Sequence, residues 1–196
     1  MRILQLIIVF SSCLISGHSL AQTEQKPPAK YRHFAIYGGI GPSYFFNNLV
    51  TGKNYVNAFQ YAFSARFMWE PRNSILSLGF ETGYYRLYSV DAPPPINAKI
   101  VNTSVPLLFV VSMKFSPKIY ADWSMGQSLQ YNNVSVPNNP HDFNNHVLSL
   151  SDFSATVGYR FIQKARISYA AEFKGYYSSL YANGTIAALF IVGYRL

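Results

Sequence analysis

The sequence predicts an all-β protein, an eight-stranded antiparallel up-and-down transmembrane β-barrel whose N- and C-termini both lie on the periplasmic side. Three observations support this fold class. The chain of 196 residues is 17% aromatic but only 12% charged. Side chains alternate in character with a period of two, as on the two faces of a strand. The connections between the alternating segments are short at one end of the predicted barrel and mostly longer at the other.

Composition excludes several other classes of protein. The length fits one domain, and the many aromatic residues with few charges argue against disorder. The single Cys, Cys13, can form neither a disulfide framework nor a Cys-based zinc site. No run of 18 apolar residues follows the N-terminal segment, which argues against a bundle of membrane helices.

The net charge of +8 comes from Lys and Arg residues that are scattered singly along the chain. Because there is no basic run and no aromatic–basic motif, we expect no nucleic-acid binding. Scattered cations and tyrosines suit contact with phosphate-bearing lipid, so outer-membrane lipid including lipopolysaccharide is the expected partner.

The N-terminus predicts export. Residues 1–21 have the parts of a signal peptide: the cation Arg2, an apolar stretch over 3–15 and a small-x-small cleavage site at 19–21. A short membrane anchor or a lipoprotein modified at Cys13 are the alternatives. Residues 22–30 are expected to form a polar leader and 31–196 the barrel, located in the cell outer membrane.

The alternation is clearest in residues 55–70, where the odd positions are almost all aromatic or apolar and the even positions are smaller or polar. The alternation continues over about 15 positions. A strand of this length exceeds the usual five or six residues of strands in soluble sheets. The same pattern predicts eight strands, at 33–46, 55–70, 76–90, 101–115, 119–129, 152–161, 166–177 and 185–196.

The connections favour a membrane barrel over a soluble one. Inner turns are expected at 71–74, 116–118 and 162–165, and outer connections at 47–54, 91–98, 132–149 and 182–184. Short turns on one side and longer loops on the other are typical of outer-membrane barrels. A soluble eight-stranded barrel would need far more than 12% charged residues on its outer face.

Turn residues predict the register of two hairpins. Asn183-Gly184 is a strong two-residue hairpin signal and, as the centre of the last turn, would pair Phe173 with Tyr194 and Glu172 with Arg195. The turn at 71–74 would bring Arg66 beside Glu81.

The polar face of the strands carries a predicted lumen charge network. An eight-stranded barrel has an interior just wide enough for its own side chains, so buried charges must pair. This favours a salt-bridged plug over the alternative of a narrow ion channel. The inward charges are Arg66, Glu81, Asp122, Asp152, Arg160, Glu172, Lys174 and Arg195.

Catalysis has one candidate region, the outer loop with His141, Asp142 and His146. A small lipid-modifying enzyme could use such a histidine with a serine and an acid. A metal site is disfavoured because two His five residues apart have no supporting ligand. Histidines among Asn and Pro are more often solvated, so we expect no enzymatic activity, no cofactor and no metal.

Several segments resemble the PorT-like outer-membrane β-barrel family of Gram-negative bacteria. The resemblance rests on Thr103-Ser-Val-Pro-Leu-Leu-Phe, Gly38-Gly-Ile-Gly, Asp152-Phe-Ser-Ala-Thr-Val-Gly-Tyr and the terminal Val192-Gly-Tyr-Arg-Leu. It covers essentially all of 31–196, although the family usually ends in an aromatic residue where this chain has Leu196. The resemblance implies a small barrel with a role in the envelope or with secretion-machinery proteins, and no catalytic residues.

Pro106 lies in the middle of a predicted strand, where it has no N–H to give to the ladder. We expect either a kink that the fold tolerates, or a local bulge or opening toward a partner.

Overall fold

The computed structural model describes residues 33–46, 56–71, 74–92, 94, 97–136, 143–164, 166–180 and 182–196. The predicted signal peptide and polar leader lie outside the described residues. Within the described part of the chain no helix is long and apolar enough to cross a membrane. The strands are β1 (Phe34–Phe46), β2 (Val56–Asn57), β3 (Phe59–Trp69), β4 (Leu76–Asp91), β5 (Lys99–Lys114), β6 (Ile119–Ser135), β7 (Phe143–Gln163), β8 (Ile167–Ser178) and β9 (Asn183–Arg195).

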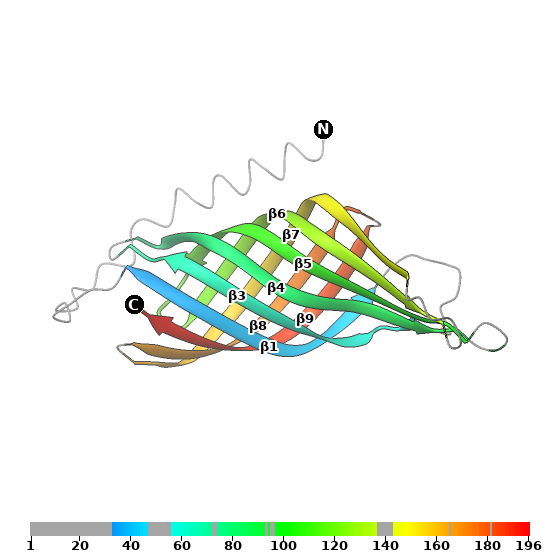
Figure 1. Cartoon of the computed structure of the whole chain (residues 1–196). Coiled ribbons are helices and arrows are strands. Elements are labelled where there is room, and N and C mark those ends of the chain that lie inside the picture. Colours follow the sequence, from blue (N-terminus) through cyan, green and yellow to red (C-terminus); the bar gives the residue numbers. More distant parts are fainter. Residues whose placement is uncertain are drawn as a thin grey trace, which may run out of the picture. The chain divides into compact units, whose positions relative to one another are not determined.

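These strands form a closed antiparallel barrel (Figure 1). From β3 to β9 each strand pairs with the next one along the chain, β1 pairs with β3, and β9 pairs with β1 to close the wall. Both β2 and β3 pair with β4, so nine strands fill eight wall positions. The predicted eight-stranded antiparallel fold is therefore confirmed.

The strands are tilted, which gives the barrel a defined shear. The pairings lead once around the wall from Ala35 and return to β1 at Phe45, ten residues further along the strand. Strand number and shear together set the width of a barrel. For eight strands the interior is a packed space that side chains fill.

The start of β1 and the end of β9 lie side by side at one end of the barrel. Ala35 pairs with Arg195, and the Leu196 N–H donates to the Phe34 carbonyl at 2.9 Å. We call this the terminal end; it also carries the connections between β3 and β4, β5 and β6, and β7 and β8. The opposite end, which we call the loop end, carries the remaining connections.

Several predicted boundaries need correction. The strand expected at 55–70 is interrupted at Ala58, where the Asn57 side chain accepts a hydrogen bond from the Phe59 N–H at 3.2 Å. The outer connection expected at 132–149 is much shorter, because β6 and β7 stay paired as far as Val134 and Phe143. Polar Asn pairs in this ladder concealed the strand from a reading based on alternation.

The predicted register of the last hairpin is wrong. Ser178 pairs with Asn183, and Phe173 pairs with Ala188 rather than Tyr194. The chain turns between Ser178 and Asn183, where Ala182 has the positive φ of 49°, and Asn183 and Gly184 already belong to β9. The predicted pairing of Arg66 with Glu81 across the β3–β4 hairpin is confirmed.

Pro106 causes no register shift. The β4–β5 pairing passes from Thr82 with Leu107 to Tyr85 with Ser104 without a change of register. On its other side β5 is paired without interruption, with Pro106 opposite Ser128. Of the alternatives that we left open at Pro106, the bulge does not form, and the irregularity of the β4–β5 ladder lies at Leu87, between Arg86 and Tyr88.

The wall has an apolar outside and a polar inside. Exposed and buried residues alternate along β3, from Phe59 to Trp69, and along most of β4. The outward residues are large and apolar, whereas the buried set is rich in Ser, Thr and charged residues. This polarity is the reverse of that in a water-soluble barrel, and it positions the site described below.

Candidate functional site in the barrel lumen

The centre of the lumen is held by one guanidinium between two carboxylates. Arg66 of β3 forms ion pairs through Nη1 with Asp122 of β6 and through Nη2 with Glu172 of β8. Tyr120 donates a further hydrogen bond to Glu172 at 2.5 Å. All of these side chains are buried, so the single cation Arg66 is paired with both carboxylates in a space without bulk water.

A second ion pair lies next to the first. The Lys174 ammonium of β8 contacts Glu81 of β4, and both side chains have no exposed surface. The Tyr85 hydroxyl donates to the same Glu81 oxygen at 3.1 Å. Lys174 and Glu172 are separated by one residue on β8, so this strand supplies a cation and an anion to the same face.

The third carboxylate cluster lies at the terminal end, around Glu70. This residue directly follows β3. Its carboxylate forms ion pairs with Lys114 at 3.2 Å, Arg195 at 3.4 Å and Arg160 at 3.7 Å. Tyr37 donates to it at 2.5 Å. Burial alone would raise the pKa of Glu70, but the neighbouring cations outweigh burial and hold this pKa below its usual value.

Toward the loop end the lumen contains a hydroxyl cluster around Asp152. Its carboxylate accepts hydrogen bonds from Ser149, from Tyr176 at 2.5 Å and from Ser178 at 2.9 Å. The Tyr176 ring stacks on Tyr85 with centroids 4.9 Å apart, which connects this cluster to the Lys174 pair. Polar contacts therefore follow one another along most of the lumen.

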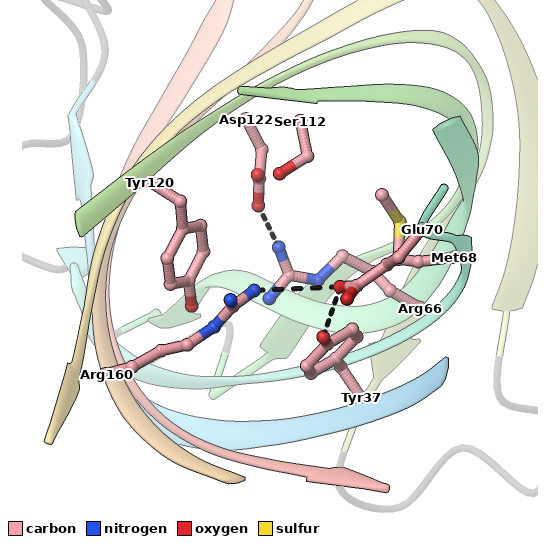
Figure 2. A pocket seen from close by; sticks show the side chains of 8 residues that line it. All are labelled: Tyr37, Arg66, Met68, Glu70, Ser112, Tyr120, Asp122 and Arg160. Atoms are coloured by element: carbon pink, nitrogen blue, oxygen red, sulfur yellow. Dashed lines mark hydrogen bonds and ion pairs between the residues drawn. The ribbon is translucent and has the colours of Figure 1, made fainter. Parts of the chain in front are cut away.

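Little free space remains among these side chains. A cavity of about 10 Å³ lies near the terminal end, enough for about one water molecule (Figure 2). Figure 2 shows Arg66 and Arg160 entering it from opposite walls, with Tyr37 hydrogen-bonded to Glu70 beside them. Its lining residues are Tyr37, Arg66, Met68, Glu70, Ser112, Tyr120, Asp122 and Arg160.

The structure places the residues of the predicted network in separate groups. Arg66, Asp122 and Glu172 meet at the centre, while Arg160 and Arg195 meet at the terminal end. The predicted contact of Glu172 with Arg195 does not form, because the last hairpin has a different register. Glu81 and Lys174 pair with each other, and Asp152 is held by hydroxyl groups.

Two members of the lumen were missed by the sequence analysis, Glu70 and Lys114. Both share the inward phase of their strands, Glu70 with the predicted member Arg66 and Lys114 with the buried Ser112. Phase alone could have identified them. Their partners come from different strands, so the pairing itself needed the closed barrel.

Of the three candidate catalytic residues the structure describes one, His146. His141 and Asp142 lie outside the described residues. His146 of β7 is exposed and lies against Tyr131, with ring centroids 6.4 Å apart. Ser149 is buried toward Asp152 instead. Among the described residues, no three His, Cys, Asp or Glu side chains are grouped so that they could hold a metal ion.

Comparison with solved structures supports the fold. A crystal structure of Ail, the attachment invasion locus protein of Yersinia pestis, superposes with a TM-score of 0.53 at 12% identity, over 85% of this chain and 100% of that chain. A second Ail structure, in complex with the heparin analogue sucrose octasulfate, gives 0.55 at 11% identity, over 83% and 97%. Neisserial surface protein A gives 0.48 at 12% identity, over 84% and 97%.

At these identities the likeness to Ail shows the shared fold, a small closed antiparallel β-barrel. No protein-family model and no curated protein sequence matches the chain.

Proposed function

We propose that this chain is an integral outer-membrane β-barrel protein without enzymatic activity, with a structural or secretion-associated role in the envelope of a Gram-negative cell. The observation that carries this proposal is the inverted polarity of the wall. Large apolar side chains such as Phe59, Phe80 and Trp123 are exposed on the outside, whereas compensated charges fill the inside. Such a surface is stable in lipid and not in water.

Exposed aromatic residues with a polar tip lie near both ends of the wall, where they suit the two membrane interfaces. This distribution supports a wall that spans the membrane. We place the terminal end in the periplasm because it carries short connections, as in outer-membrane barrels with an even number of strands. At the terminal end these residues are Trp69, Tyr159 and Tyr194, and toward the loop end they are Tyr44, Tyr61, Tyr84 and Tyr177.

The filled lumen favours a structural or interaction role over transport. The Arg66 cluster and the Lys174–Glu81 pair lie across the interior, and the nearby cavity holds about one water molecule. The resemblance of the 103–109 segment to PorT-like barrels supports a function among envelope or secretion-machinery proteins. The loop end would then face the partner.

The alternatives have less support. A lipid-modifying enzyme would need a histidine beside a serine and an acid, but His146 is exposed while Ser149 and Asp152 are buried together. A narrow ion channel would need a path past the paired charges. Planar-bilayer recordings should show no discrete conductance steps for the wild-type protein; regular steps that change in size in Arg66→Ala would favour the channel.

Fractionation of membranes tests the proposed function. The tagged protein should sediment with the outer membrane and should show a heat-dependent shift in gel mobility, which reports a folded barrel. Affinity purification in mild detergent should then recover envelope proteins in stoichiometric amounts if the role is in an assembly, or the barrel alone if the role is structural. Recovery in the soluble fraction would contradict the proposal.

A further inference from the structure

Arg86 is a cation on the outside of the wall. It shares the outward phase of β4 with Phe80 and Tyr84, and its side chain is only partly exposed. Its guanidinium carbon lies 5.9 Å from the centre of the Tyr61 ring on β3. No ion pair within the described part of the chain includes Arg86, and its buried Nε has no hydrogen-bond partner there.

Polar and aromatic groups surround this guanidinium. Tyr61 stacks on Tyr84 with centroids 6.2 Å apart, and the Tyr84 hydroxyl lies 3.4 Å from the Thr103 hydroxyl. Thr103 is the residue of β5 that pairs with Arg86. The cluster of Tyr61, Tyr84, Arg86 and Thr103 therefore spans three adjacent strands on the outward face of the wall, with Thr103 itself buried, in the half of the barrel nearer the loop end.

An apolar groove begins beside this cluster. Its volume is about 460 Å³, and it extends over the outer wall from β4 to β7. Val105, two residues from Thr103 on the same face, lines it next to the cluster, and Phe80 and Phe109 line it toward the terminal end. The remaining lining residues are Leu107, Leu108, Met125, Gly126, Gln127, Ser128, Leu129 and Leu148.

We propose that Arg86 and this groove form a binding site for a phosphate-bearing membrane lipid, with the phosphate at Arg86 and an acyl chain in the groove. This inference rests on the proposed function, because it requires the outer wall to face lipid. A cation without a protein carboxylate at a lipid-facing position is costly unless an anion pairs with it. The planar guanidinium can donate two parallel hydrogen bonds to a phosphate group, and the exposed tyrosine hydroxyls can donate more.

The acyl-chain part of the site follows from shape and chemistry. The groove starts beside the only charge of the cluster and continues along apolar side chains toward the middle of the wall. A lipid with its headgroup near the loop end would lie along the barrel in the same direction. One molecule can therefore satisfy the charge and fill the groove, which a free phosphate ion cannot do.

A lipid-binding experiment tests the site. The protein, refolded in zwitterionic detergent, would be titrated by native mass spectrometry with bis-phosphorylated lipid A and with the same lipid after removal of both phosphates. We expect the phosphorylated lipid to bind more tightly. Arg86→Gln should weaken its binding roughly tenfold, because a charge-assisted bidentate contact is lost. Arg166→Gln, at an exposed turn of the terminal end, removes the same charge and should leave binding unchanged.

A second variant tests the role of the groove. Val105→Trp should fill the space beside Arg86 and weaken lipid binding while the charge is kept. Equal binding of both lipids, or wild-type affinity in Arg86→Gln, would overturn the proposal. If Arg86→Gln does not fold, Arg86→Lys takes its place, and the loss of bidentate bonding should still weaken binding. Heat-modifiable mobility and outer-membrane fractionation of the wild type separate a failure of this site from a failure of the proposed function.

Discussion

Arg66 and Glu81 are paired in register on neighbouring strands, yet each forms its ion pair with a residue on another part of the wall. Arg66 binds Asp122 of β6 and Glu172 of β8, and Glu81 binds Lys174 of β8. These contacts connect wall positions that share no backbone hydrogen bonds. Ion pairs thus join distant parts of the wall and fill the interior together with buried apolar residues such as Leu108 and Ile191.

Replacement of Arg66 by methionine should strongly destabilise the barrel. The variant keeps much of the side-chain volume but leaves the carboxylates of Asp122 and Glu172 buried without their cation. Breaking a buried ion pair in this way costs roughly 3–5 kcal/mol. Urea unfolding in lipid vesicles, followed by gel mobility, would measure the loss. Arg166→Met is the matched control, because Arg166 is exposed, and an equal effect of both variants would contradict the assigned role.

The Lys174–Glu81 pair should tolerate reversal better than either single change. Lys174→Glu puts a second buried carboxylate beside Glu81, and Glu81→Lys puts a second cation beside Lys174, so each should lower stability. The double variant restores opposite charges at the same two positions. A double-mutant cycle should therefore give a favourable coupling energy of roughly 1–3 kcal/mol. Additive losses would show that the two side chains do not interact.

Gly158 should not accept a side chain. A Cβ atom at this position would lie 2.2 Å from Cζ of Tyr120, whose ring covers the glycine. That ring cannot move freely, because its hydroxyl is bonded to Glu172 and Arg160 lies 4.6 Å from its centre. Gly158→Ala should cost roughly 1–3 kcal/mol, as for other overpacked interiors.

Gly38 offers the control for that change. A Cβ atom there would meet no atom within 4 Å, so Gly38→Ala should have little effect on unfolding. If Gly38→Ala destabilises the barrel as much as Gly158→Ala, the loss would come from the glycine backbone rather than from Tyr120.

The Glu70 cluster predicts a particular pH dependence. The lowered pKa of Glu70 means that its ionised form stabilises the folded state; this contribution is complete above the unfolded pKa and is lost as the pH falls through the folded one. Glu70→Gln should therefore reduce stability at pH 7, where it leaves Lys114, Arg160 and Arg195 without their anion. The difference from the wild type should shrink below about pH 4.

Unfolding of both proteins in urea across this pH range would test the prediction. Asp91→Asn, at an exposed position at the end of β4, should show no comparable change. A Glu70→Gln difference that stays constant with pH would mean that the residue acts through packing alone.

Much of the barrel was predictable from sequence because its two faces differ so clearly. The alternation in 55–70 and the Arg66–Glu81 register depend on local pattern and on a short turn. The outer ends of β6 and β7 were not predictable in this way, since Asn132 and Asn133 pair with Asn145 and Asn144 and leave no apolar face to detect. Alternation of apolar and polar residues therefore gives no signal where both faces of a ladder are polar.

Which lumen charges pair with each other could not be predicted from the sequence, for a different reason. Alternation gives the phase of each charge, but its partner depends on the shear of the closed wall. Glu172 was expected opposite Arg195, and the structure brings it to Arg66, more than a hundred residues away in the chain. The shift arose from the last turn, where the Asn183-Gly184 signal was stronger than the signal of the actual turn residues.

The register of that last hairpin can be tested directly. The structure pairs Phe173 with Ala188, whereas a turn centred on Asn183-Gly184 would pair Phe173 with Tyr194, six residues further along β9. In a chain without Cys13, the variant with Phe173→Cys and Ala188→Cys should form an intramolecular disulfide on mild oxidation, since directly paired Cβ atoms lie close enough to be bridged. The variant with Phe173→Cys and Tyr194→Cys should stay reduced. Non-reducing gels of the folded protein distinguish the two, and the opposite result would mean that β9 is shifted along β8 and that Glu172 faces Arg195 after all.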